Sequence, residues 1–144
     1  MKNYMKMELY SCSQNESFCR NAVAAFALPL NPSLNELSDI KTAVSEAVTN
    51  CIVHAYKGGE GKIFLECELD GDTLSVVVRD EGAGIEDVEK AIKPFFTTLT
   101  SEERSGMGFT IMQMFMSDFS VESERGKGTV VTLKKRISYK EENA

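Results

Sequence analysis

Alternating apolar and polar positions predict that the chain opens with a half-buried strand over residues 5–10. Ser13 and Glu16 then have the spacing of a capping box, and apolar residues recur on one helical face until Pro29. Because the hydrophobic period lengthens from two residues to about 3.6 at this point, the pattern predicts a strand followed by a helix.

A second capping box, Ser33 with Glu36, predicts the start of a longer helix. The apolar residues of this segment form a stripe at helical spacing: Leu37, Ile40, Val44, Ala47, Val48, Cys51 and Ala55. The helix is expected to end near Lys57, because two glycines follow.

Two antiparallel hairpins are predicted further along the chain. Residues 63–69 and 74–78 alternate around a polar turn at 70–72. Strands over 119–124 and 129–137 flank a turn that contains two glycines. The chain therefore combines helices with strands that pair through short turns.

The segment between the hairpins breaks the alternation. We expect a short helix over 86–92, an irregular polar stretch over 94–108 and a helix over 109–116. No linker divides the chain, so residues 1–137 are expected to form one domain with a polar tail over 138–144.

Composition narrows the class of protein. Of 144 residues, 42% are hydrophobic and 26% are charged, as in a globular protein with one ordinary core. The net charge of −6, with scattered Lys and Arg residues, argues against direct binding of nucleic acid. Four widely spaced cysteines argue against a zinc site and favour reduced thiols. No apolar run suits a signal peptide or a membrane span, so we expect a cytoplasmic protein.

Three polar residues, Glu46, Asn50 and His54, share the face of the second helix opposite its apolar stripe. This face could simply be solvated. Alternatively, a carboxylate and an amide one turn apart can form a general base beside an oxygen ligand for Mg²⁺. His54 has no carboxylate partner in the sequence and is expected to pack near the end of the helix rather than accept phosphate.

Glycines mark three further segments. Residues 79–85 place Asp80 and two glycines at a strand end, where the backbone can approach a flat ligand and the carboxylate can accept from an exocyclic amine. Residues 104–109 lead into a helix, whose free N–H groups can bind an anion. Residues 126–129 form a hairpin turn. Each segment alone is also explained as an ordinary turn, and neither a Walker A loop nor the protein-kinase motif set is present.

The order of these motifs resembles the family that includes the ATPase domains of gyrase, Hsp90 chaperones, MutL repair proteins and sensor histidine kinases. The matching residues are 46–50, 80–84, 106–108 and 126–129. The resemblance implies the Bergerat ATP-binding fold, an α+β two-layer sandwich with helices on one face of a mixed, mostly antiparallel sheet. It also implies that ATP and Mg²⁺ bind between the Asn-bearing helix and a loop over the phosphates.

Within that family, residues 13–18, 45–50, 96–98 and 103–112 resemble the anti-sigma-F kinases of spore-forming bacteria. This resemblance implies a serine kinase that sequesters a sigma factor of the sigma-F type and phosphorylates the anti-anti-sigma protein opposing it. No separate helical segment bears a phosphoacceptor histidine, so phosphate would pass to another protein. Relatives act as dimers, and the first strand and helix are plausible interface elements.

The same resemblance implies roles for individual residues. Glu46 would be the base that orients the acceptor serine, and Asn50 would hold Mg²⁺. Asp80 would accept from the adenine amino group, and Thr129 would support the adenine side. The other nucleotide-binding positions belong to the glycine loop, the phosphate cradle and the lid: Gly82, Gly84, Ile85, Gly106, Met107, Gly108, Phe109, Thr97, Thr98 and Ser105.

Two arginines carry further predictions. Arg104 lies in the lid, where its guanidinium could stabilise the transferring phosphoryl group or could simply be exposed. The lid has Leu99-Thr100 where many relatives have Lys-Pro, so a phosphate contact from that lysine is lost or supplied elsewhere. Arg20 is off the apolar stripe and is predicted to dock a partner, although it could equally be solvated.

Two other functions compete with a kinase that binds a sigma factor. An ATPase or gyrase-like energy module is disfavoured, because no second domain is expected that would convert hydrolysis into motion. An ATP-gated binding protein without catalysis is the other alternative.

Overall fold

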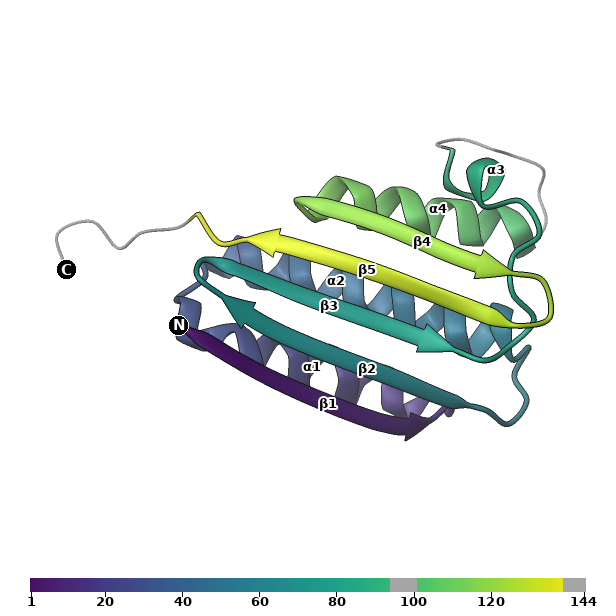
Figure 1. Cartoon of the computed structure of the whole chain (residues 1–144), viewed down its shortest axis with the longest axis horizontal. Coiled ribbons are helices and arrows are strands. Elements are labelled where there is room, and N and C mark those ends of the chain that lie inside the picture. Colours follow the sequence, from purple (N-terminus) through teal and green to yellow (C-terminus); the bar gives the residue numbers. More distant parts are fainter. Residues whose placement is uncertain (94–100, 139–144) are drawn as a thin grey trace, which may run out of the picture.

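A five-stranded sheet carries the helices on one of its faces, so the protein has two layers (Figure 1). The computed structural model describes residues 1–93 and 101–138, with the backbone alone for 101–107. The strand order is β1-β2-β3-β5-β4. The strands are β1 (Lys2–Tyr10), β2 (Lys62–Asp70), β3 (Thr73–Asp80), β4 (Asp118–Glu124) and β5 (Gly128–Arg136).

The helices, and the irregular turns that extend them, follow the predicted order. They are α1 (Gln14–Ala27), the 3₁₀ turn η1 (Leu28–Leu30), α2 (Leu34–Thr49), the π-helical η2 (Asn50–Ala55), α3 (Val88–Ile92) and α4 (Ser101–Phe115). The α+β two-layer prediction is confirmed. Every strand pairing among the described residues is antiparallel, where a mixed but mostly antiparallel sheet was expected.

The core lies between the sheet and the helices. Along β3 the side chains alternate strictly, with Leu74, Val76, Val78 and Asp80 buried on the helix side. The helices contribute fully buried residues such as Val23 and Ile40. Within the described residues, none of the helices is both long and apolar enough to cross a membrane.

The two predicted capping boxes have different outcomes. At α2, the Ser33 hydroxyl accepts from the Glu36 N–H at 3.1 Å, and Glu36 accepts from the Ser33 N–H at 2.9 Å. At α1, Ser13 already has helical backbone angles (φ −59°, ψ −29°) and makes no side-chain cap. Because a cap requires extended backbone, the Ser13 prediction was wrong, and Glu16 is left to form other contacts.

The second helix ends as predicted, but through a wider turn. The Tyr56 N–H donates to the Cys51 carbonyl at 3.0 Å, five residues back, as in a π-helix. Single π-helical turns of this kind are frequent at functional sites. Here the turn contains Asn50, which the sequence singled out as a metal ligand.

The last helix begins eight residues earlier than expected, at Ser101 rather than Phe109. The acidic residues Glu102 and Glu103 are typical of a first helical turn, because negative charge is favoured at the positive end of the helix dipole. The prediction gave more weight to the two glycines, each of which costs only about 1 kcal/mol in a helix interior. The irregular stretch expected over 94–108 is therefore wrong from residue 101 onward.

Candidate functional site

Glu46 and Asn50 lie one turn apart on α2 and its π-helical continuation, and both face Gly108 on α4. A Cβ at position 108 would lie 3.0 Å from Glu46 Oε2 and 3.6 Å from Asn50 Oδ1. Glycine therefore lets the two helices approach closely at this point. Of the three residues predicted to share this face, Glu46, Asn50 and His54, the first two are confirmed to do so by their common approach to Gly108.

Glu46 is half-buried, and its environment favours the protonated carboxyl. Burial raises the pKa of Glu46, and the negative charge of Glu16 raises it further. A carboxylate with a raised pKa is a stronger proton acceptor, which suits a general base.

Glu16 is held beside this base by residues from two helices. Its carboxylate accepts hydrogen bonds from Arg20 at 2.8 and 2.6 Å. The Ser45 hydroxyl of α2 donates to the same carboxylate. This network ties α1 to α2 next to Glu46, and sequence reasoning missed it because Glu16 was assigned to a helix cap.

Asn50 carries a buried polar atom without a partner. Its Nδ2 has no hydrogen bond to any described residue. Leaving a buried donor unsatisfied costs about 1–3 kcal/mol, so the arrangement calls for an explanation. A nucleotide with Mg²⁺ supplies one, since the NH₂ can donate to a phosphate oxygen and the amide oxygen is a ligand that Mg²⁺ accepts. The side chain therefore fits the metal and phosphate end of a nucleotide.

Asp80 is the buried acceptor at the end of β3, with 5% of its surface exposed. Its carboxylate accepts from the Gly82 N–H at 2.9 Å, from the Cys51 thiol and from the Thr129 N–H. Burial raises the pKa of Asp80, and these hydrogen bonds act in the opposite direction. The carboxylate is thus fixed in place with acceptor capacity to spare for an exocyclic amine.

The glycines around Asp80 allow close approach, as predicted, but the approach seen is between backbone segments. Gly84 has φ +74°, and a Cβ there would lie 2.1 Å from the Glu124 carbonyl oxygen. Gly128 has φ +106°, and its Cβ would lie 2.1 Å from the Asp80 carbonyl oxygen. These contacts hold the loop after β3 against the β4–β5 hairpin.

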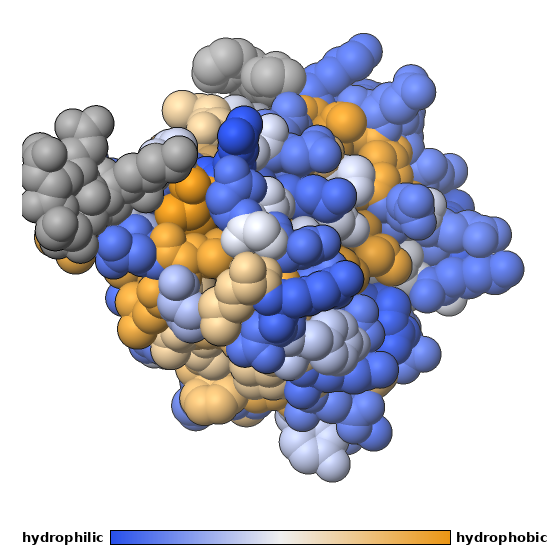
Figure 2. Space-filling view, turned by 60° about the vertical axis from the view of Figure 1, so that its left-hand side comes forward, coloured by the Kyte–Doolittle hydropathy of each residue, from blue (hydrophilic) through white to orange (hydrophobic). Residues whose placement is uncertain are grey.

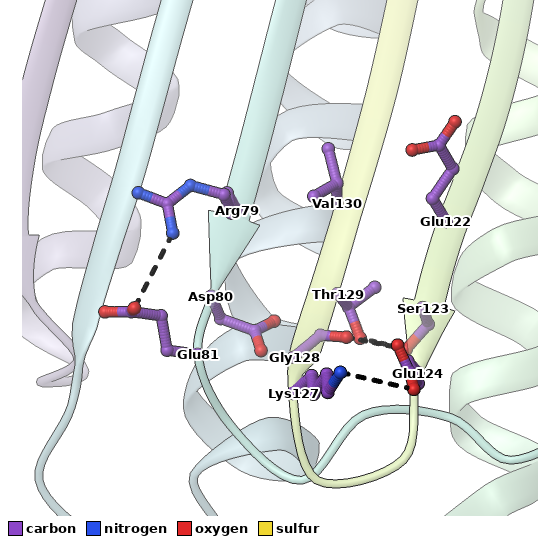
Figure 3. Close-up of a pocket in the computed structure, with 10 residues that line it drawn as sticks. All are labelled: Arg79, Asp80, Glu81, Glu122, Ser123, Glu124, Lys127, Gly128, Thr129 and Val130. Carbon is purple, nitrogen blue, oxygen red and sulfur yellow. Dashed lines mark hydrogen bonds and ion pairs between the residues drawn. The ribbon is translucent and has the colours of Figure 1, made fainter.

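A pocket of about 310 Å³ opens beside the ends of β3, β5 and β4 (Figure 3). Asp80, Ser123 and Thr129 lie along it, and the Ser123 and Thr129 hydroxyl oxygens are 2.8 Å apart. Charged side chains from the helix-free face of the sheet complete its rim: Arg79, Glu81, Glu122, Glu124 and Lys127.

Several predicted positions fall inside α4 or close to it. The residues of the expected phosphate cradle, from Gly106 to Phe109, lie within the helix rather than at its start. The Phe109 side chain is in the core, with its ring 5.8 Å from that of Phe119. Only the backbone is described for Arg104, Ser105, Gly106 and Met107, and Thr97 and Thr98 lie outside the described residues.

A model of the histidine kinase-like ATPase domain matches residues 14–135. This range includes both ends of the site, with Glu46 and Asn50 at one end and Asp80 and Thr129 at the other. The chain belongs to the histidine kinase-like ATPase family. Membership implies ATP binding, and it agrees with the fold and with the arrangement of Asn50 and Asp80.

Curated relatives of this chain are named anti-sigma F factor. One from Thermoanaerobacter sp. (strain X514) is 55% identical, and the match covers 94% of each chain. One from Caldanaerobacter subterraneus subsp. tengcongensis is 56% identical with the same coverage. One from Bacillus subtilis is 50% identical over 96% of this chain and 95% of the relative. The resemblance to anti-sigma F factors inferred from the motifs is therefore confirmed.

Three residues that the sequence reasoning missed connect the parts of this histidine kinase-like ATPase site. Cys51 follows Asn50 directly and bonds to Asp80, so it joins the two ends. It had been counted only in the apolar stripe. Ser45 tethers Glu16, and Ser123 contacts Thr129. Ser123 could have been found, because alternation along β4 turns it inward with Phe119 and Val121.

Proposed function

We propose that the chain is an ATP-dependent serine protein kinase and anti-sigma factor. It would bind a sigma factor of the sigma-F type and phosphorylate a serine of the anti-anti-sigma protein. The observation that carries the proposal is the juxtaposition of Glu46 with the Asn50 amide nitrogen, which has no hydrogen-bond partner within the described part of the chain. The next residue, Cys51, donates a hydrogen bond through its thiol to the buried Asp80. The names of the relatives support the choice of partner.

Nucleotide binding would use both ends of the site. Asp80 would accept from the adenine amino group, with Thr129 beside it and with Gly82, Gly84 and Ile85 forming the adjoining loop. Asn50 would coordinate Mg²⁺, which neutralises charge on the phosphates. The N–H groups of Gly106 to Phe109 lie inside α4, so binding phosphate with them requires the first turns of this helix to open.

Phosphoryl transfer would use Glu46 as the base. The acceptor serine oxygen attacks the γ-phosphorus and forms a P–O bond, its proton passes to the Glu46 carboxylate, and the bond to ADP breaks. The raised pKa of Glu46 supports this assignment. Arg104 would stabilise charge on the transferring group, with Thr97, Thr98 and Ser105 in the lid.

The acceptor protein has a route to Glu46. A groove of about 470 Å³ runs along α1 and α2, and its lining consists of Arg20, Leu34, Leu37, Ser38, Lys41, Thr42, Ser45 and Glu46. Leu34 is 85% exposed, and Figure 2 shows apolar groups among hydrophilic ones at the end of the molecule where α2 begins. We therefore assign Arg20 to partner docking, with the acceptor serine reaching Glu46 along this groove.

A homodimer is part of the same proposal. The strand β1 is at the edge of the sheet, so one side of its backbone is open to pairing, and its Tyr4 and Tyr10 are exposed. Sedimentation equilibrium of the purified chain would test this part. A monomer at micromolar concentration would contradict it without affecting the nucleotide site.

Incubation with labelled ATP, Mg²⁺ and a candidate anti-anti-sigma protein tests the kinase. Label on a serine of that protein supports the proposal. Label released only as inorganic phosphate would instead indicate an ATPase, and retained ATP without transfer would indicate an ATP-gated binding protein.

A further inference from the structure

Ser123 makes three hydrogen-bonding contacts at the wall of the nucleotide site. It lies on β4 directly opposite Thr129 of β5 and faces the helix side of the sheet. Its hydroxyl oxygen is 2.7 Å from the Ile85 nitrogen, 2.9 Å from the Gly128 oxygen and 2.8 Å from the Thr129 hydroxyl oxygen. Figure 3 shows Ser123 and Thr129 side by side, with Asp80 on the neighbouring strand.

Counting protons determines how these groups pair. The Ile85 N–H can only donate and the Gly128 carbonyl can only accept, whereas each hydroxyl has one proton and two lone pairs. If Ser123 donates to Gly128, it can accept from both Ile85 and Thr129, and all three contacts are satisfied. If Ser123 donates to Thr129 instead, the contact with Gly128 is lost. The arrangement with three hydrogen bonds therefore prevails, since each contributes about 0.5–1.5 kcal/mol.

This pairing determines what Thr129 offers to a ligand. Its hydroxyl proton is used by Ser123, so its oxygen faces the site as an acceptor. The Asp80 carboxylate, which receives the Thr129 N–H, is an acceptor as well. Two acceptors side by side match the amino group at position 6 of adenine and oppose the oxygen that guanine carries there.

We infer that Ser123 is a positioning residue that determines nucleobase specificity by fixing the hydroxyl of Thr129 as an acceptor. The inference rests on the proposed function, since it assumes that adenine lies against Asp80. Ser123 itself would not contact the nucleotide. Its effect passes through one neighbouring hydroxyl, and this distinguishes it from a residue that merely holds the hairpin together.

The test compares ATP with GTP on the whole chain in the presence of Mg²⁺. Dissociation constants are measured for each nucleotide by competition with a fluorescent ATP analogue. In the unchanged protein GTP binds more weakly than ATP. In Ser123→Ala the freed Thr129 hydroxyl can donate to guanine, so the ratio of the GTP constant to the ATP constant falls about tenfold.

Three further variants test whether the change in the ratio depends on the Ser123 hydroxyl and is transmitted through Thr129. Ser123→Thr keeps the hydroxyl and retains the ratio of the unchanged protein. Ser120→Ala removes the same group from an exposed position of β4 on the other face of the sheet, and also leaves the ratio unchanged. In a Thr129→Val background, Ser123→Ala no longer alters the ratio, because the hydroxyl that transmits the effect is absent.

Two outcomes would overturn the inference. Equal weakening of ATP and GTP by Ser123→Ala indicates a purely structural role, and a change of ratio that persists with Thr129→Val excludes transmission through Thr129. Both constants are measured on one sample, so partial unfolding cancels from the ratio. If the unchanged chain binds neither nucleotide, the proposed function itself fails, and this result is distinct from ATP binding with an unaltered ratio.

Discussion

The two ends of the site differ in how completely their polar groups are satisfied. Around Asp80, the carboxylate receives three donors, and Ser123 bonds to the adjoining loop and hairpin. Around Glu46 and Asn50, a carboxyl has a raised pKa and the Asn50 amide nitrogen has no hydrogen-bond partner among the described residues. The first end has the features of a rigid recognition site. The second retains one buried donor without a partner among the described residues, beside a carboxyl with a raised pKa, which suits a place where charge and protons move.

Glu46→Gln is expected to have the largest effect, because it removes the proton acceptor from the reactive end. Phosphoryl transfer to serine falls by about 10²–10⁴-fold, the usual contribution of a general base. The dissociation constant of ATP stays within a factor of about two, since Asp80 is untouched. Initial rates with labelled ATP and calorimetric titration measure the two quantities.

The matched control for this variant is Glu68→Gln, an exposed carboxylate of β2 that lies on the helix-free face of the sheet, away from the pocket beside Asp80. Its transfer rate should equal that of the unchanged protein. Undiminished transfer in Glu46→Gln would remove Glu46 from the role of base.

Gly128→Ala tests how much the close packing around Asp80 contributes to the stability of the protein. The new Cβ would lie 2.1 Å from the Asp80 carbonyl oxygen at a backbone φ of +106°, so both backbone strain and a clash are introduced. We expect the free energy of unfolding to fall by about 3 kcal/mol, as measured by urea denaturation.

Gly126→Ala is the control for strain alone. It has a similar φ of +81° in the same turn, but no atom within 4 Å of a Cβ at this position. It should cost only about 1 kcal/mol. If both variants lose the same free energy of unfolding, the close contact between Gly128 and the Asp80 carbonyl does not contribute to stability.

Local sequence rules predicted the recognition end well and the reactive end less well. Alternation located β3 and hence Asp80 at its end, and glycine spacing indicated a close approach of the backbone, although it was expected toward a ligand and is seen toward the β4–β5 hairpin. These features depend on neighbours in the sequence or across a hairpin. By contrast, the bond from Ser45 to Glu16 joins residues 29 positions apart, and no local pattern encodes it.

The two helix starts show the same limit. Ser13-x-x-Glu16 and Ser33-x-x-Glu36 have identical spacing, yet only the second forms a capping box. Glu36 also receives the Ser138 N–H at 2.9 Å, whereas Glu16 is drawn to Arg20 and Ser45. Arg20 lies one turn along the same helix and Ser45 lies on α2, and a carboxylate gains more from a charged donor and a second hydroxyl than from one N–H, so contacts beyond the capping-box spacing decided between equivalent signals.

Asp80→Asn tests whether the Asp80 carboxylate binds the adenine amino group of ATP. An amide can still contact the adenine amino group through its oxygen, but it loses the charge and must place an NH₂ among three existing donors. We expect ATP affinity to fall by about 10–100-fold, from losing a charge-assisted hydrogen bond. Transfer at saturating ATP should largely recover.

Titration calorimetry and transfer rates at several ATP concentrations separate these effects. Asp87→Asn, a helix-cap residue of α3, provides a control with the same chemistry. Unchanged ATP binding in Asp80→Asn would contradict the assignment of this end to the nucleotide base.

Glu16→Gln is expected to have the smallest effect, and it tests whether the charge of Glu16 raises the pKa of Glu46. Glu16 contributes to the raised pKa of Glu46 through its negative charge, so removing that charge lowers the pKa of Glu46. A base with a lower pKa is ionised at lower pH, and the acidic limb of the kcat/KM profile therefore moves toward lower pH. Arg20 loses its partner in this variant, so Arg20→Gln is measured alongside: there Glu16 keeps its charge without compensation, and the same limb moves toward higher pH. Shifts of the same sign in both variants would show that Glu16 acts on Glu46 by packing rather than by charge.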